Sequence, residues 1–305
     1  MKPTGLPGLP PSRDALRRPR KPRPTRLGLA LTSWAAASTF AKATADKLAP
    51  ALTAALVPLL LAACTGSTPK GYEPPRTADG HPELQGVWQA RNAANWDLQD
   101  HAGALGLPAG FGVVVDPPDG VIPYLPDARA KKTANFASRE QADPLQKCYL
   151  AGVPRTMYLP HPLQIFQTVN DVVFLSEYVH TWRWVPLTPL ERYPGYESWM
   201  GDPRGRWEGD TLVVETVGFN GETWLDHSGN HHSPELKVVE RLKRTGPDVI
   251  TYEATLEDPK VFSRPWTIRM PLERVNDRTQ VLEYECYLYA EDAGRPIVGE
   301  HPELK

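Results

Sequence analysis

The sequence predicts an all-β protein, an antiparallel meander of strands that closes into a barrel and carries one short helix and long loops. Its composition is the first reason, because 33 prolines, 9 tryptophans and 11 tyrosines favour a turn-rich β protein over a helical one. Short β-rich runs also recur along the chain, separated by hairpin-like turns such as PPDG at 117, ND at 170 and WEGD at 207. A long antiparallel sheet must close or cover its edges, so a barrel is expected before a two-sheet sandwich, and no repeat supports a propeller.

Ten segments are expected to be strands, either because apolar and polar residues alternate or because a short apolar run lies between turn signals. In chain order they are 86–90, 111–116, 121–125, 163–169, 172–187, 211–217, 236–244, 249–256, 265–272 and 280–288. The stretch 199–210 is predicted to be a loop before a hairpin, where turn chemistry explains Asp202 and Arg204 and a place on a cavity rim is the alternative. Only 126–140 predicts a helix, since Pro126 opens it and an Ala-rich run follows.

Residues 1–63 have the features of a signal segment. They hold 10 Lys and Arg against 2 acids, and the apolar run Leu48 to Ala63 precedes Cys64. This run is short for a membrane span and suits a signal core. The sequence LAAC resembles a bacterial lipobox, which implies that Cys64 is lipidated and anchors the chain to a membrane. Because Thr65 is not Asp, we expect the periplasmic side of the outer membrane; a plain secretory signal or one N-terminal span are the alternatives.

The remainder predicts a flexible Pro/Gly/Thr tether over 64–83 and a single barrel domain over 84–305. Outside the leader, 24 basic residues face 34 acidic ones, and this balance argues against a nucleic-acid partner. Once Cys64 is acylated, Cys148 and Cys286 form an even pair in an oxidising compartment. They predict a disulfide, with two buried free thiols as the alternative.

Several enzyme classes lack their usual motifs. The chain has no G-x-S-x-G, Walker A, H-E-x-x-H, C-x-x-C or G-x-G-x-x-G. Nucleotide-dependent chemistry, thioredoxin-like redox chemistry and the common serine hydrolase and zinc peptidase routes are therefore not indicated. We expect no cofactor and no metal.

A resemblance supports the fold and the compartment. Gly86-Val87-Trp88 resembles the Gly-x-Trp that opens lipocalin-type barrels. From Arg76 to about Tyr287 the chain is also similar to a large uncharacterised family of exported bacterial proteins, through RTADGHPELQGVWQ, DPLQKCYLAGVPR, WMGDPRGRWEGDTLVVETVGFN, TWLD, HSPELKVVERLKR and DPKVFSRPWTIRMPLE. This resemblance implies export and a lipocalin-like (calycin-like) β fold, and it supplies no reaction and no functional residues.

The strand 236–244 carries a carboxylate on its apolar face. By the period of two, Glu240 lies with Val238 and Leu242 on the inward face. Burial of an unpaired carboxylate is costly and raises its pKa, so Glu240 needs a partner or a role. One expectation is a salt bridge to a buried arginine, Arg183 or Arg269, and the other is acid–base chemistry or ligand binding.

The loop before this strand offers Asp226 and three histidines. His227 and His231 are four residues apart, but the Gly-Asn between them favours a turn over a helical zinc site, which leaves a loop metal site as an alternative. We expect His227 and His231 to be exposed. His232 is expected nearest the mouth of the barrel cavity.

Aromatic residues gather in the run 172–187. One of its two faces carries Tyr178, His180, Trp182 and Trp184. If that face points inward, His180 lies in an aromatic slot suited to a small molecule or a sugar; a hydrogen-bonded core histidine is the alternative.

These observations predict an exported lipoprotein whose barrel cavity binds a small organic or saccharide ligand. The predicted ligand-binding residues are Tyr178, Trp182 and Trp184. Acid–base chemistry of a lyase or hydrolase is predicted for the set His180, Asp226, His232 and Glu240. A non-catalytic binding protein and an envelope scaffold are the alternatives.

Overall fold

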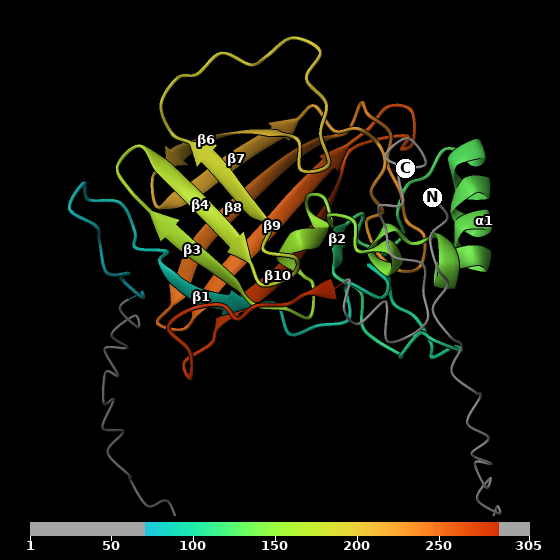
Figure 1. Cartoon of the computed structure of the whole chain (residues 1–305), viewed down its shortest axis with the longest axis horizontal. Helices are drawn as coiled ribbons and strands as arrows, with labels where there is room; N and C mark the ends of the chain where they lie inside the picture. Colours follow the sequence, from blue (N-terminus) through green and yellow to red (C-terminus); the bar gives the residue numbers. More distant parts are fainter. Residues whose placement is uncertain (1–70, 287–305) are drawn as a thin grey trace, which may run out of the picture. The chain divides into compact units, whose positions relative to one another are not determined.

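A computed structural model describes residues 71–286 and confirms an all-β barrel with long loops (Figure 1). Its strands are β1 (Gly86–Gln89), β2 (Val114–Asp116), β3 (Leu163–Gln167), β4 (Asp171–Ser176), β5 (Trp182–Pro186), β6 (Asp202–Glu208), β7 (Thr211–Val217), β8 (Lys237–Gly246), β9 (Val249–Glu257) and β10 (Trp266–Arg274). The helices are α1 (Pro126–Ala142) and the 3-10 turns η1 (Pro144–Lys147) and η2 (Arg155–Met157). The strands pair in the order β5-β4-β3-β1-β10-β9-β8-β7-β6, and β2 pairs with β10.

The core follows from side-chain alternation. In β8 every second residue is buried, so Val238 and Leu242 face the interior while Lys237 and Lys243 face outward. The Gly-x-Trp opening has a packing reason, because Gly86 has a φ of 132° and an added Cβ would lie 2.2 Å from Nη1 of Arg274. The Arg274 guanidinium lies 4.2 Å from the ring centroid of the fully buried Trp88.

The barrel is nearly closed because of its strand count. Eight successive antiparallel pairings lead from β5 around to β6, so these two end strands run parallel to each other and cannot pair as the others do. We call the gap between β5 and β6 the seam. Parallel neighbours need a long crossover connection, and residues 187–201 supply it as a loop that arches away from the barrel (yellow in Figure 1). Gly205 lets the two strands approach, since an added Cβ would lie 2.8 Å from Val185 Cγ1.

The predicted single strand 172–187 is wrong, because a tight turn divides it into β4 and β5. Thr181 N donates to the carbonyl of Tyr178 (3.2 Å), and Val179 and His180 have φ values of 45° and 51°. Two central residues with positive φ are the pattern of a type I′ hairpin turn, which usually selects Asn-Gly. Val-His at these positions gives no such signal, so the sequence hides the turn.

Other boundaries also differ from the prediction. Residues 202–208, expected in a loop, form β6. The expected strand 121–125 reduces to an isolated bridge between Tyr124 and Phe262, and 280–286 of the last expected strand reduces to a bridge between Tyr178 and Tyr284. The predicted helix 126–140 is confirmed and extends to Ala142.

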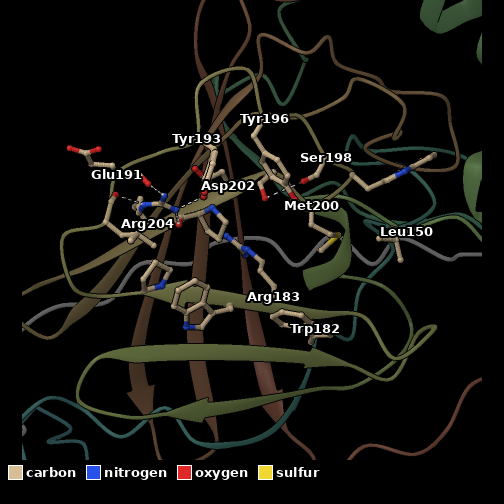
Figure 2. Close-up of a pocket in the computed structure, with 16 residues that line it drawn as sticks. Leu150, Trp182, Arg183, Glu191, Tyr193, Tyr196, Ser198, Met200, Asp202 and Arg204 are labelled. Atoms are coloured by element: carbon tan, nitrogen blue, oxygen red, sulfur yellow. Dashed lines mark hydrogen bonds and ion pairs between the residues drawn. The ribbon is translucent and has the colours of Figure 1, made fainter.

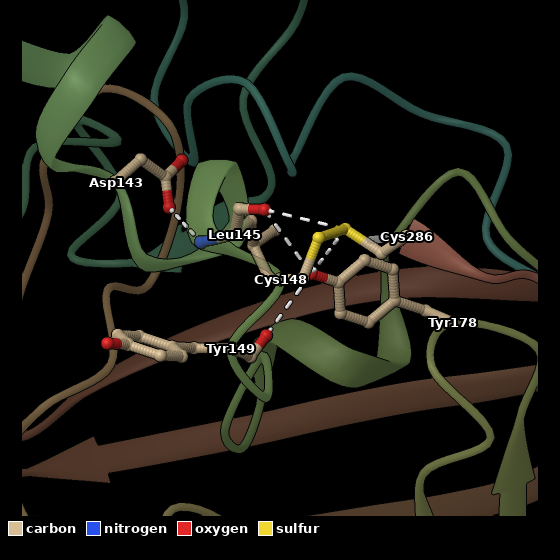
Figure 3. Close-up of a disulfide and its surroundings, with 6 residues drawn as sticks. All are labelled: Asp143, Leu145, Cys148, Tyr149, Tyr178 and Cys286. Carbon is tan, nitrogen blue, oxygen red and sulfur yellow. Dashed lines mark hydrogen bonds between the residues drawn. A yellow bond between two sulfur atoms is a disulfide. The ribbon is translucent and has the colours of Figure 1, made fainter. Parts of the chain in front are cut away.

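A disulfide joins Cys148 and Cys286, as predicted, and fixes the last described residues beside η1 (Figure 3). The late part of the expected tether contacts the barrel, where Arg76 pairs with Asp210 and His81 stacks on Trp207. The leader and the lipidation site Cys64 lie outside the described residues. Between residues 71 and 286, no helix has the length and apolar character needed to cross a bilayer.

Candidate functional site

The seam opens into a cleft of about 490 Å³. Its walls are β5, the beginning of β6 and the arched connection between them, so it lies where the strand order leaves β5 and β6 without a hydrogen-bonded ladder between them. In Figure 2 Tyr193 and Tyr196 of the connection lie opposite Trp182 of β5, with Arg183 between them. The lining residues are Leu150, Trp182, Arg183, Trp184, Pro186, Leu190, Glu191, Tyr193, Tyr196, Ser198, Trp199, Met200, Gly201, Asp202, Pro203 and Arg204.

Large aromatic side chains around this cleft are exposed to solvent. Trp182 is 66% exposed, Trp184 45%, Tyr193 83% and Tyr196 54%. In β5 the buried residues alternate with the tryptophans, so Arg183 faces the interior and the tryptophans face outward. The tryptophans of the predicted ligand-binding set therefore line the outer cleft, not the barrel cavity.

Apart from Glu191, the charged residues that line the cleft are paired with other charged residues. Arg204 pairs with Asp202 and donates from Nε to the carbonyl of Leu190 (2.9 Å), which fixes the connection against β6. Arg192 of the connection pairs with Asp202 on β6 and with Glu215 on β7. These arginines thus hold the loop in place, and the cleft presents aromatic surface with little free charge.

Glu240 lies directly behind the cleft in the barrel interior and is fully buried. Arg183 donates from Nη1 to its Oε1 (3.0 Å) and also pairs with its second oxygen, while Tyr252 donates its hydroxyl to Oε1 (2.9 Å). Arg183 Nη2 donates to Thr216 Oγ1 (2.9 Å). The expected salt bridge of Glu240 to Arg183 is confirmed, and the carboxylate is fully engaged in this network.

Two further predicted residues lie elsewhere. His180 is half-exposed at the tip of the β4–β5 turn, with Nδ1 3.7 Å from Glu285, so it is not in an inward aromatic slot. Tyr178 is buried beside the disulfide and donates its hydroxyl to the carbonyl of Tyr149 (3.1 Å; Figure 3). Neither residue lines the cleft.

The loop that carries Asp226 and the histidines is buried, which corrects the expectation that His227 and His231 are exposed. Asp226 accepts hydrogen bonds from Leu98 N (2.9 Å) and from Asn230. Burial, together with the nearby charge of Asp97, raises the pKa of Asp226 to about 7.

The last two histidines of this loop are also buried. His232 is bonded to Thr223 Oγ1 (2.6 Å) through Nε2 and to the carbonyl of Ser233 through Nδ1. Burial lowers the pKa of His232 and lowers that of His231 to about 4. Both imidazoles are therefore neutral parts of the packed loop near pH 7.

Sequence reasoning missed a second buried cluster, at the end of α1. Asp143 accepts two hydrogen bonds of 2.8 Å from Arg155 and a 2.9 Å hydrogen bond with His227 Nδ1. Burial alone would raise the pKa of Asp143, but Arg155 and His227 outweigh it and hold that pKa well below its usual range. No pattern around Asp143 predicts this, because its partners are 12 and 84 residues away.

The four predicted catalytic residues are not assembled by these contacts. Among residues 71–286 no hydrogen bond or ion pair joins any two of His180, Asp226, His232 and Glu240. In the same part of the chain, no group of three or more His, Cys, Asp and Glu side chains is arranged to hold a metal ion.

The fold and the cleft define a nearly closed antiparallel barrel with an aromatic cleft at its seam. Comparisons with protein-family models, with curated proteins and with solved structures found no match for this chain. The function is therefore inferred from the site itself.

Proposed function

We propose that this protein is an exported, lipid-anchored protein of the outer membrane that binds a small organic or saccharide ligand in the seam cleft. One observation carries the proposal: exposed aromatic rings surround a hollow of ligand size. Apolar surface left in water costs roughly 25 cal/mol per Å², so exposed tryptophans and tyrosines around one cleft favour a binding role over a structural one. Pockets of this volume typically hold one ring-bearing molecule.

The occupant we favour is a small molecule, because the strand edges at the seam resist the addition of a peptide strand. β5 ends in Pro186 and β6 contains Pro203, and proline lacks the N–H that a pairing strand needs. The carbonyls of Asp202 and Pro203 are already bonded to Arg192 and Arg204. A ligand that stacks on ring faces needs none of these backbone groups.

Binding without catalysis is the function that the contacts favour. The carboxylate and imidazole groups expected to transfer protons are separately engaged, and Glu240 is bound to Arg183 and Tyr252. The cleft itself contributes rings, paired charges and the carboxylate of Glu191. Among the described residues, the converging pair of Asp143 and His227 is buried at the end of α1 and does not line the cleft, so it gives no support to acid–base chemistry on the ligand.

The test is a binding titration with defined probes. Phenyl β-D-glucoside, cellobiose and 2-naphthol are each titrated into the purified chain. Binding is followed by intrinsic tryptophan fluorescence and by thermal unfolding. At least one should bind, and a probe at 100 times its Kd should add about 2.7 kcal/mol to the free energy of unfolding. The double variant Trp182→Ala, Trp184→Ala should lose at least about tenfold in affinity, the equivalent of about 1.4 kcal/mol.

The matched control is Phe111→Ala, which removes an aromatic ring that is 88% exposed and does not line the cleft. It should bind like the parent protein. Binding that survives loss of both tryptophans, or no binding of any probe at millimolar concentration, would contradict the proposal.

A further inference from the structure

The cleft continues onto an unusual outer sheet face. Six outward residues of β3, β4 and β5 form two cross-strand rows, Phe166–Val173–Trp184 and Gln164–Leu175–Trp182, and the outward Asp171 at the start of β4 lies beside them. We call these six side chains the apolar outer face. Five of the six are apolar, none is charged, and Phe166, Trp182 and Trp184 are 42%, 66% and 45% exposed.

The opposite wall of the barrel shows that this composition is not general. On the outside of β8, β9 and β10 the corresponding positions hold charged pairs, such as Arg269 with Glu253 on β10 and β9. Lys237 of β8 pairs in the same way with Glu215 of β7. A solvent-facing sheet is normally polar, so the apolar outer face is a local exception and indicates a partner.

Two hollows share this face. The seam cleft includes Trp182 and Trp184 at one side. A second hollow of about 650 Å³ includes Gln164, Phe166 and Leu175 at the other side and is bordered by 279–283 of the C-terminal segment. Trp182 is the direct cross-strand neighbour of Leu175, and Trp184 lies in one row with Phe166. The two hollows are therefore adjacent on the apolar outer face.

Residues 279–283, which border the apolar outer face, are fixed in place by hydrogen bonds. Gln164 Nε2 donates to the carbonyl of Thr279 (3.2 Å), and Leu282 N donates to Glu177 Oε2 (2.9 Å). The disulfide at Cys286 holds the segment a few residues further on. Trp184 is also fixed, because its Nε1 donates to Asp171 Oδ1 (2.7 Å). Rings held in advance lose little entropy when a ligand stacks on them.

We infer that the ligand is a linear, uncharged saccharide chain, which lies across β5, β4 and β3 from the seam cleft to the second hollow. The inference rests on the proposed function and names its ligand class. Pyranose rings present an apolar C–H face to an aromatic ring and hydroxyls to the rim. Strands are spaced about 4.8 Å apart, so Phe166 and Trp184, two strands apart, are about 10 Å apart, close to the length of one disaccharide unit.

A linear saccharide fits the apolar outer face and its two hollows better than other ligands do. A single ring would fill one hollow and leave the second ring platform at Phe166 in water. A flat protein surface is obstructed by the connection 187–201 on one side and by 279–283 on the other. An anionic chain would meet the carboxylates of Glu191 and Glu283 in the linings of the two hollows, where Arg183 and Arg204 are already paired with acids.

The experiment compares chain lengths. Cello-oligosaccharides and chito-oligosaccharides of two to six units are titrated into the purified full chain, and binding is followed by tryptophan fluorescence and calorimetry. Affinity should rise at least tenfold between the disaccharide and the tetrasaccharide in at least one series and then level off. Phe166→Ala should abolish this gain and leave disaccharide affinity within twofold, whereas Phe111→Ala should keep the gain. Circular dichroism confirms that each variant is folded.

The outcomes separate the two proposals. If the disaccharide binds but longer chains bind no more tightly, or if Phe166→Ala keeps the gain, the inference fails and the proposed function stands. Binding of 2-naphthol, or of phosphatidylcholine vesicles, without binding of any oligosaccharide also overturns the inference. Failure of every probe overturns both.

Discussion

At the scale of single residues, burial decides which titratable groups affect stability. Asp226 holds its proton in the folded protein until about pH 7, whereas an ordinary aspartate loses it near 3.8. Because the folded-state pKa of Asp226 is the higher one, its contribution to stability is fully present below pH 3.8. The contribution is lost as the pH rises from 3.8 to 7, where the unfolded state releases the proton and the folded state keeps it. His231 and His232 act in the opposite sense, because their lowered pKa values mean that stability is lost as pH falls below 6.5.

Asp226→Asn isolates the carboxylate. Between pH 6 and 8 the free energy of unfolding of the parent should fall by about 1.4 kcal/mol more than that of the variant, because the histidines are the same in both proteins and their contribution cancels in the comparison. The variant is expected to be less stable at pH 6, since an amide cannot accept all three hydrogen bonds made to the carboxylate by Leu98 and Asn230. Urea unfolding at four pH values measures both effects. Parallel curves for the two proteins would show that Asp226 is ionised throughout.

At the scale of elements, the β4–β5 turn is a local conflict between sequence and backbone. Val179 and His180 are in the left-handed region, where a β-branched or bulky side chain costs roughly 1–2 kcal/mol. Replacement by the favoured pair, Val179→Asn with His180→Gly, should raise the free energy of unfolding by about 1–2 kcal/mol, as measured by urea unfolding. The control Val169→Asn, at an exposed valine without positive φ, should change it by less than about 0.5 kcal/mol. A destabilised double variant would indicate that packing at the turn outweighs backbone strain.

The same elements show how far the sequence predicts this fold. Alternation places β8 and its inward Glu240 correctly, because one face of that strand is continuously buried. It fails at β6, where Pro203 and Gly205 read as loop residues. They are tolerated because β6 is an edge strand and because Gly205 lies against Val185. The hairpin at Val179 is missed for the related reason that its turn lacks the usual residues.

The candidate site was only partly predictable for a geometric reason. Trp182 and Trp184 are recognisable in the sequence as candidates for ligand binding, but their outward orientation depends on the missed turn. The cleft lies at a place set by the whole strand count, since one fewer or one more strand would make β5 and β6 antiparallel and able to continue the antiparallel ladder. Tyr193 and Tyr196 lie in the connection 187–201, and its place at the edge of the cleft follows only from the number of strands.

At the scale of the whole molecule, side chains replace part of the missing pairing at the seam. Arg183 reaches from β5 past β6 to Thr216 on β7 and Glu240 on β8. This network joins the two ends of the sheet inside the barrel, in a place where hydrogen-bonded strands would otherwise do so. A buried ion pair can be replaced by apolar groups at little cost, but removal of one partner leaves a buried charge.

The network therefore predicts a non-additive pattern in urea unfolding. Glu240→Leu alone should reduce the free energy of unfolding by about 3–5 kcal/mol, because Arg183 is left buried and unpaired. Adding Arg183→Met and Tyr252→Phe removes the unpaired guanidinium and hydroxyl, leaves only the Thr216 hydroxyl without its arginine partner, and should recover most of the loss. Arg241→Met, which breaks an exposed pair with Glu208, should cost at most about 1 kcal/mol. If the triple variant is no more stable than Glu240→Leu, the stability of the barrel depends on the charges themselves. Apolar packing could then not replace the ion pair that joins the two sides of the seam.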